Sequence, residues 1–169
     1  MYKSGAKLTM VSVLVILLAI LLAALLAYLT PASVDTGADA DWAPVVEEGR
    51  LPGYEDSPVN NDGRYFYYQL CKEVTFNKPT APGNVLIENT TGNTCDMQVE
   101  YQLADDGTVI YTSPMLKPGQ HLLEDKLSAE LEEGSYDVVA KIYVYDQETG
   151  DIKDDFSENI TVVVKNKLF

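Results

Sequence analysis

The sequence predicts an all-β domain, an antiparallel sandwich of seven or eight short strands, preceded by one N-terminal transmembrane helix. Three observations predict it: an unbroken apolar run over 8–29, short runs rich in aromatic and β-branched residues over 64–165, and turn residues between those runs every 8–12 positions. We therefore divide the chain into a cytoplasmic N-terminus (1–7), a transmembrane helix (8–29), a flexible acidic tether (30–63) and a β-sandwich domain (64–169).

Residues 8–29 have the length and composition of a membrane span. The run carries no charged residue, and at about 1.5 Å per residue it crosses a hydrocarbon core of about 30 Å. Lys3 and Lys7 precede it, whereas the first charges after it are acidic, so the positive-inside rule predicts an N-in, C-out orientation. Pro31 then ends the helix. We expect a single-pass protein of the cell membrane with its domain outside the cytoplasm.

Two alternatives remain for this segment. A cleaved signal peptide has a shorter apolar core and a small-x-small cleavage site, whereas this exit reads Thr30-Pro31-Ala32, with proline inside the site. The run also resembles the N-terminal helix of type IV pilins, which would make the chain a pilin-like subunit whose helix packs into a filament. Lys7 and Ser12 depart from that family, which has Gly or Ala before the cleavage and Glu at the fifth mature position.

The segment 30–63 is rich in Pro, Gly, Asp, Ser and Asn and shows no hydrophobic period. Such a segment buries too little apolar surface to offset the entropy of ordering it, so it is predicted to be a tether. A flexible chain of this length spans about 30 Å root-mean-square. Trp42, Val45 and Val46 are exceptions, which we expect to be exposed rather than docked on the domain.

The strands of the domain are predicted from alternation and from turns. The longest alternating runs, 96–103 and 135–146, place apolar residues on one face and mostly polar or aromatic residues on the other. Asp106-Gly107 is a hairpin turn, and Lys117-Pro118-Gly119 has proline and glycine where turns favour them. The predicted strands are 64–70, 72–76, 85–88, 96–103, 108–113, 121–127, 135–146 and 160–164.

Residues 131–136, Leu-Glu-Glu-Gly-Ser-Tyr, have the Leu-x-x-Gly-x-Tyr form of a tyrosine corner. In that motif Leu131 packs inward, Gly134 permits the bend and the Tyr136 hydroxyl bonds to upstream backbone. The chain here resembles immunoglobulin-like and fibronectin-type sandwiches. Over 64–165 it is similar to extracytoplasmic β domains of membrane-anchored surface proteins of Gram-positive bacteria. The resemblance implies an immunoglobulin-like fold, and it implies little about function because many of those domains have no assigned activity.

Cys71 and Cys95 are candidates for a disulfide, because the domain is expected in a compartment where disulfides persist. Closing that loop would stabilise the fold by about 3–4 kcal/mol on the chain-entropy model. Cys95 lies on the apolar face of its strand, whereas Cys71, two residues before Glu73, would lie on the same strand face as Glu73. A bridge therefore needs a bulge or a strand break near Lys72, and without one the two are separate thiols.

The charge of the chain excludes some partners. The net charge is −14, and all 26 Asp and Glu residues follow residue 29, so nucleic acid would be repelled. Asp146, Glu148 and Asp151 offer oxygen ligands for calcium, but without EF-hand spacing, and solvated surface acids are the competing interpretation. The single histidine, His121, follows a Pro-Gly turn and is expected at the surface. We predict no catalytic residue and no cofactor.

Tyr65, Tyr67, Tyr143 and Tyr145 form a possible binding face, because tyrosine gives a large contact area at low entropy cost. Coverage of these rings by a neighbouring strand or by the tether is the competing interpretation. We expect a non-enzymatic module that is displayed at the cell surface and binds a protein or an envelope polymer. A carbohydrate-binding or accessory domain of an envelope enzyme, and a calcium-dependent adhesion domain, are the alternatives.

Overall fold

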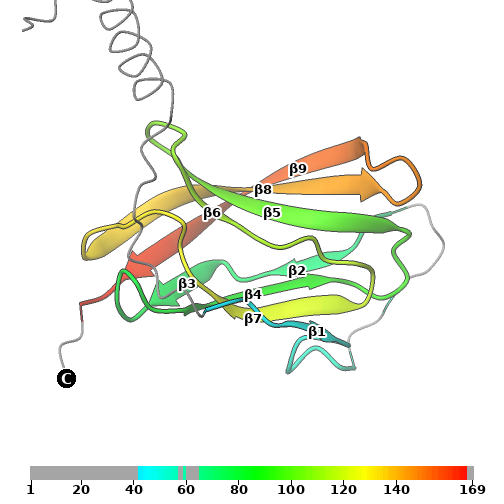
Figure 1. Ribbon diagram of the computed structural model, residues 1–169, viewed down its shortest axis with the longest axis horizontal. Helices are drawn as coiled ribbons and strands as arrows, with labels where there is room; N and C mark the ends of the chain where they lie inside the picture. Colours follow the sequence, from blue (N-terminus) through cyan, green and yellow to red (C-terminus); the bar gives the residue numbers. More distant parts are fainter. Residues whose placement is uncertain (1–41, 57–58, 60–64, 167–169) are drawn as a thin grey trace, which may run out of the picture. The chain divides into compact units, whose positions relative to one another are not determined.

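The computed structural model describes residues 42–56, 59 and 65–166, and this part of the chain is all-β (Figure 1). The predicted transmembrane helix and most of the predicted tether lie outside these residues. No helix within the described ranges is long and apolar enough to cross a membrane. The strands are β1 (Val46–Glu48), β2 (Tyr68–Leu70), β3 (Glu73–Phe76), β4 (Gly83–Asn89), β5 (Cys95–Leu103), β6 (Val109–Thr112), β7 (Gln120–Asp125), β8 (Gly134–Asp146) and β9 (Ile152–Val164).

The strands form one mixed sheet in the order β1-β7-β4-β3-β9-β8-β5-β6, with β2 paired to β4. All these pairs are antiparallel except β3 with β9, which run parallel from Glu73↔Thr161 to Phe76↔Val164. The prediction of a purely antiparallel fold is therefore wrong at this pair. The physical reason is the break at Cys71 and Lys72. Before the break, β2 pairs with β4; after it, the chain continues as β3 and pairs with β9.

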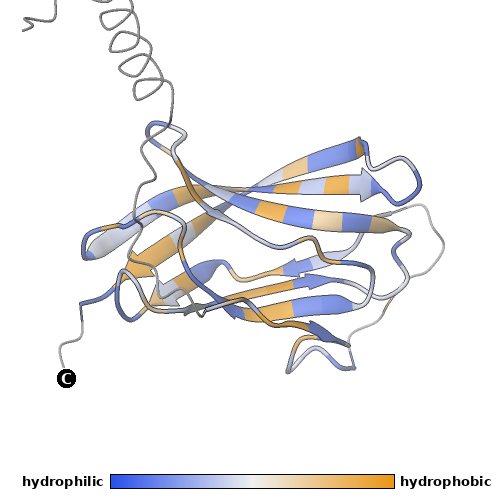
Figure 2. Ribbon diagram, viewed as in Figure 1, coloured by the Kyte–Doolittle hydropathy of each residue, from blue (hydrophilic) through white to orange (hydrophobic). Residues whose placement is uncertain are grey.

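The sheet bends so that β6, β5, β8 and β9 face β1, β7, β4 and β2, with β3 between the two groups (Figure 1). Apolar and polar residues alternate along β5 and β8, as Figure 2 shows, and the apolar set faces inward. The largest fully buried side chains include two tyrosines, Tyr101 and Tyr111, whose ring centroids lie 4.8 Å apart. The core is therefore built from alternate residues of facing strands.

Part of the predicted tether belongs to the domain. Val46 pairs with Leu122 of β7 and packs against the core, and Leu51 is only 3% exposed. The expected exposure holds for Val45 and is wrong for Val46. Trp42 is 40% exposed but is docked on the domain, because Lys126 Nζ lies 5.5 Å from the centroid of its ring. Residues 46–51 are held by partners that lie far along the chain, which a local hydrophobic pattern does not reveal.

The last strand is also longer than predicted. β9 begins at Ile152 rather than at residue 160, and it pairs with β8 along its length with one register shift between Val144 and Tyr145. Its first half, Ile-Lys-Asp-Asp-Phe-Ser-Glu-Asn, is mostly polar, so the sequence pattern does not indicate a strand there. The first half of β9 is a strand because its backbone pairs with β8.

Candidate functional site

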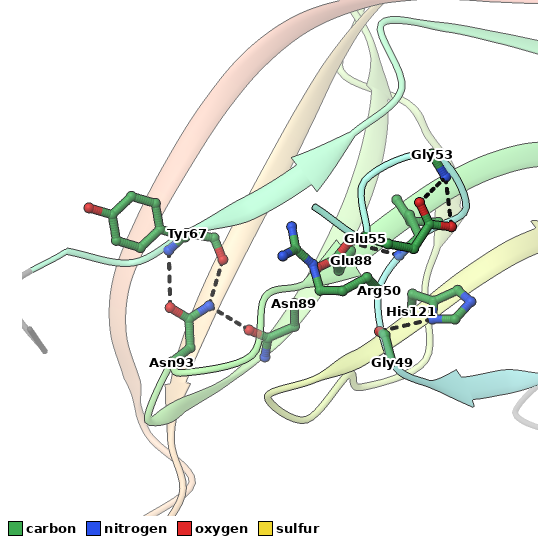
Figure 3. Close-up of polar contacts among 10 residues, drawn as sticks. Gly49, Arg50, Gly53, Glu55, Tyr67, Glu88, Asn89, Asn93 and His121 are labelled. Carbon is green, nitrogen blue, oxygen red and sulfur yellow. Dashed lines mark hydrogen bonds and ion pairs between the residues drawn. The ribbon is translucent and has the colours of Figure 1, made fainter. Parts of the chain in front are cut away.

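A buried carboxylate joins the segment before β2 to the sheet. Glu88 of β4 is 0% exposed, and its two oxygens take different partners (Figure 3). Arg50 Nε lies 2.5 Å from Glu88 Oε1, and the Leu51 backbone N–H donates to Oε2 at 2.9 Å. Because burying a charged group is costly unless it is paired and hydrogen-bonded, both contacts offset the cost of placing this side chain in the interior.

The same segment covers the neighbouring histidine. His121 of β7 pairs with Glu88 across the ladder and is buried, and its Nδ1 lies 3.1 Å from the Gly49 carbonyl oxygen. The expectation that His121 lies at the surface is therefore wrong, because residues 49–55 cover this face of β4 and β7. We call Arg50, Leu51, Glu88 and His121 the Glu88 clamp.

The loop that supplies the clamp is itself fixed. Gly49, at φ 108°, donates its N–H to the Gly119 carbonyl at 2.7 Å. The Gly53 N–H donates to both carboxylate oxygens of Glu55, at 2.9 and 3.0 Å. Backbone hydrogen bonds from Glu55 itself and from Gly53 lower the pKa of the Glu55 carboxyl. The clamp holds a chain segment in place.

A second network fixes the backbone before β2. Asn93 donates from Nδ2 to the Tyr67 carbonyl at 2.5 Å and accepts the Tyr67 N–H on Oδ1 at 3.1 Å (Figure 3). Asn93 also donates to Asn89 Oδ1 at 2.7 Å, and Asn89 donates to the carbonyls of Cys95 and Leu116. Tyr67 is therefore tied through two amide side chains to the first residue of β5.

The four tyrosines of the predicted binding face lie in two places. Tyr65 is 66% exposed, and its ring meets Tyr67 edge-on with centroids 6.4 Å apart. Tyr143 and Tyr145 point outward from β8, since Val144 between them is buried. The Tyr145 hydroxyl donates to Gln98 Oε1 at 3.3 Å. The structure brings Tyr65 together with Tyr67, but it does not place all four rings on one surface.

Both cysteines are free, so the predicted disulfide is not formed. The strand break near Lys72 is present, yet the two residues attach to different points of β4. Cys71 donates its N–H to the Leu86 carbonyl, whereas the Cys95 carbonyl accepts from Asn89, three residues further on. The two thiols also have different neighbours: Cys71 Sγ donates to the Glu73 carbonyl at 3.0 Å, whereas Lys153 Nζ lies 3.9 Å from Cys95 Sγ.

The acidic residues of the last hairpin serve the turn. Asp146 Oδ1 accepts the backbone N–H groups of Glu148 and Thr149 at 2.9 and 3.1 Å, and these bonds lower the pKa of Asp146. In residues 42–56, 59 and 65–166, no group of three His, Cys, Asp or Glu side chains is placed to hold a metal ion. Asp146, Glu148 and Asp151 are therefore not brought together as the candidate calcium ligands.

The tyrosine-corner motif has the contact that its sequence predicts. The Tyr136 hydroxyl donates to the Glu132 carbonyl, four residues upstream, at 2.9 Å. Leu131 packs against the core. A Cβ atom at Gly134 would lie 3.4 Å from the Tyr136 ring, which is an ordinary van der Waals distance, so close approach of the ring does not by itself require glycine here. The motif fixes how the chain enters β8.

Sequence reasoning missed the buried polar residues. Glu88 and Asn89 follow directly on the apolar run Val85–Ile87, and no local pattern marks them as buried. The partners of Glu88 lie 37 and 38 residues upstream. Asp125, at the end of β7, is buried as well, and burial raises the pKa of its carboxyl.

Comparisons with known proteins add no assignment to this geometry. No family model matches the chain, and neither the curated proteins nor the solved structures contain a significant match. The function is therefore argued from the residues and their arrangement.

Proposed function

We propose that this protein is a single-pass membrane protein that displays an immunoglobulin-like domain outside the cytoplasm as a non-enzymatic binding module. The observation that carries the proposal is the Glu88 clamp, because it fixes how the chain enters the domain. Because residues 46–51 are docked on the domain, the segment that sets its reach from an anchor ends at about residue 45. The apolar run 8–29, with Lys3 and Lys7 before it, supplies the anchor and its orientation.

The strand pairing supports the immunoglobulin-like part of the proposal. In such domains the second strand pairs with the fifth in one sheet, and the sixth pairs with the third and the seventh in the other. If β2 and β3 are taken together as the first strand, β4 with β7 gives the first of these pairings, and β8 with β5 and β9 gives the second. The Tyr136 corner lies at the start of β8, the position where these domains carry it.

The mechanism of such a module is display. The anchor sets the location, the segment between the anchor and β1 sets the reach, and the surface of the domain recruits a protein or an envelope polymer. The net charge of −14 disfavours nucleic acid as that partner.

The test is topology in intact cells. The full chain with a C-terminal epitope tag should fractionate with membranes, and external protease should remove the tag while a cytosolic marker stays intact. N-terminal sequencing of the purified protein should return Met1. A mature N-terminus at Leu8 would favour the pilin-like subunit, and one after Ala32 would favour a cleaved signal peptide. A tag that stays in the soluble cytosolic fraction would refute the proposal.

A further inference from the structure

A cavity of about 290 Å³ has none of the residues of the Glu88 clamp in its lining. Three parts of the chain form it: the residues before β2, the loop between β4 and β5, and the start of β9. Its volume of about 290 Å³ lies just below the range for small-molecule sites, about 300–1,000 Å³, so it is matched to one ring-sized group. The lining includes Tyr65, Phe66, Asn93, Thr94, Lys153 and Asp154.

The aromatic wall of this cavity is held in place before any ligand arrives. The backbone of Tyr67 is fixed on both sides by Asn93, and the Tyr65 ring packs edge-on against the Tyr67 ring. Phe66 stacks on Phe156 of β9 with centroids 6.3 Å apart and an angle of 14°. A ligand therefore meets preordered rings, which removes much of the entropy cost of binding.

The polar wall offers hydrogen-bonding groups of several kinds. Thr94 carries a hydroxyl, and Lys153 and Asp154 are exposed charged residues on the adjacent strand. An exposed ring beside donors and acceptors suits a ligand that is apolar on one face and hydroxylated around its rim. Sugar rings have this chemistry. An anionic polymer does not fit, because the chain carries a net charge of −14.

We propose that this cavity, the Tyr65 cavity, binds one ring of a neutral saccharide, with the Tyr65 face against the sugar's C–H groups and Asp154, Lys153 and Thr94 at its hydroxyls. The inference rests on the proposed function, because it names the ligand class that the displayed domain would recognise. It also separates Tyr65 from the outward tyrosines of β8, which the sequence groups with it.

The test is a binding titration with the full chain in lipid nanodiscs, which avoids sugar-based detergents. The probes are tetrasaccharides of N-acetylglucosamine, of β-linked glucose and of α-linked glucose, followed by saturation-transfer NMR. At least one probe should bind saturably at millimolar concentration. Tyr65→Ala should weaken that binding by about tenfold or more, whereas Tyr65→Phe, which keeps the ring, should keep it.

Tyr143→Ala is the matched control, because it removes a partly exposed tyrosine from the outward face of β8, and it should leave binding unchanged. Thermal melting of each variant checks that the domain is folded. The inference is overturned if no probe binds, if Tyr65→Ala and Tyr143→Ala bind equally, or if a tetralysine peptide binds at Tyr65 in place of every saccharide. The topology test does not involve sugar. A failure of the saccharides to bind would therefore overturn this inference without affecting the test of the proposed function.

Discussion

Glu88 shows how one buried charge depends on residues far along the chain. Its partners, Arg50 and the Leu51 N–H, come from a segment that precedes β2. Removing one member of a buried ion pair costs about 3–5 kcal/mol, because the remaining group keeps its desolvation penalty. The sequence around Glu88 could not predict this site, since a glutamate at the end of an apolar run is equally compatible with the surface.

Glu88→Gln should lower the free energy of unfolding by about 3 kcal/mol, because glutamine keeps a hydrogen-bond acceptor but loses the charge that pairs with Arg50. Urea titration, followed by the fluorescence of the single tryptophan, Trp42, measures it. Glu133→Gln, at an exposed glutamate, is the control and should change stability by less than about 0.5 kcal/mol. Equal effects of the two substitutions would contradict the clamp.

Among the elements, β3 joins the two halves of the sheet, because it pairs with β4 on one side and with β9 on the other. Its only pair with β4 is Phe76↔Gly83. A Cβ atom at Gly83 would lie 2.5 Å from the Phe76 ring and 2.7 Å from the Thr75 carbonyl oxygen. Glycine is therefore required here by close approach.

Gly83→Ala should destabilise the domain by about 3 kcal/mol, because the new methyl group overlaps a buried ring and a backbone oxygen that cannot both move away. Gly150→Ala is the control: its Cβ atom meets nothing within 4 Å, and only the positive φ of 75° adds strain, about 1 kcal/mol. Thermal unfolding of the two variants gives the comparison. A smaller loss at Gly83 than at Gly150 would show that β3 and β4 separate without cost.

Elements with a strong local pattern were predictable. The strands predicted at 96–103 and 135–146 correspond to β5 and β8 within one residue at each end, because one buried face imposes alternation. The three-residue strand β1 and the polar half of β9 were not predictable, because each is formed by a partner strand rather than by its own residues. The Tyr136 corner was predictable from its motif. The break between β2 and β3 was not, because the sequence left open whether Cys71 is bridged to Cys95, which requires a break or a bulge, or is a separate thiol, which does not.

At the scale of the whole molecule, the pH dependence of stability combines carboxylates that act in opposite directions. Backbone and side-chain hydrogen bonds from Thr108 lower the pKa of Asp106, so ionised Asp106 contributes stability that is lost as the pH falls through its folded pKa. Burial raises the pKa of Asp125, so ionised Asp125 costs stability at neutral pH, and protonation relieves this cost as the pH falls. Falling pH also reduces the repulsion within a chain of net charge −14.

The two aspartates therefore give a paired prediction. Asp125→Asn should raise the melting temperature at pH 7, and this gain should shrink as the pH falls through the raised pKa of Asp125. Asp106→Asn should lower the melting temperature at pH 7, and this loss should shrink as the pH falls below the range where Asp106 ionises. Thermal scans across the acid range measure both. Shifts of the same sign at pH 7 would contradict the opposite environments of the two carboxylates.

The docking of β1 changes where mechanical load enters the domain. A pull on the chain upstream of residue 46 is borne first by the three residue pairs between β1 and β7 and by the contacts of Glu88, and only afterwards by β2. Those few contacts can break while the core stays folded. The chain between β1 and β2 then adds to the length between the pulled end and the domain. If the N-terminal end is anchored as proposed, the docking of β1 shortens the reach of the domain at rest, and the release of β1 lengthens it under tension.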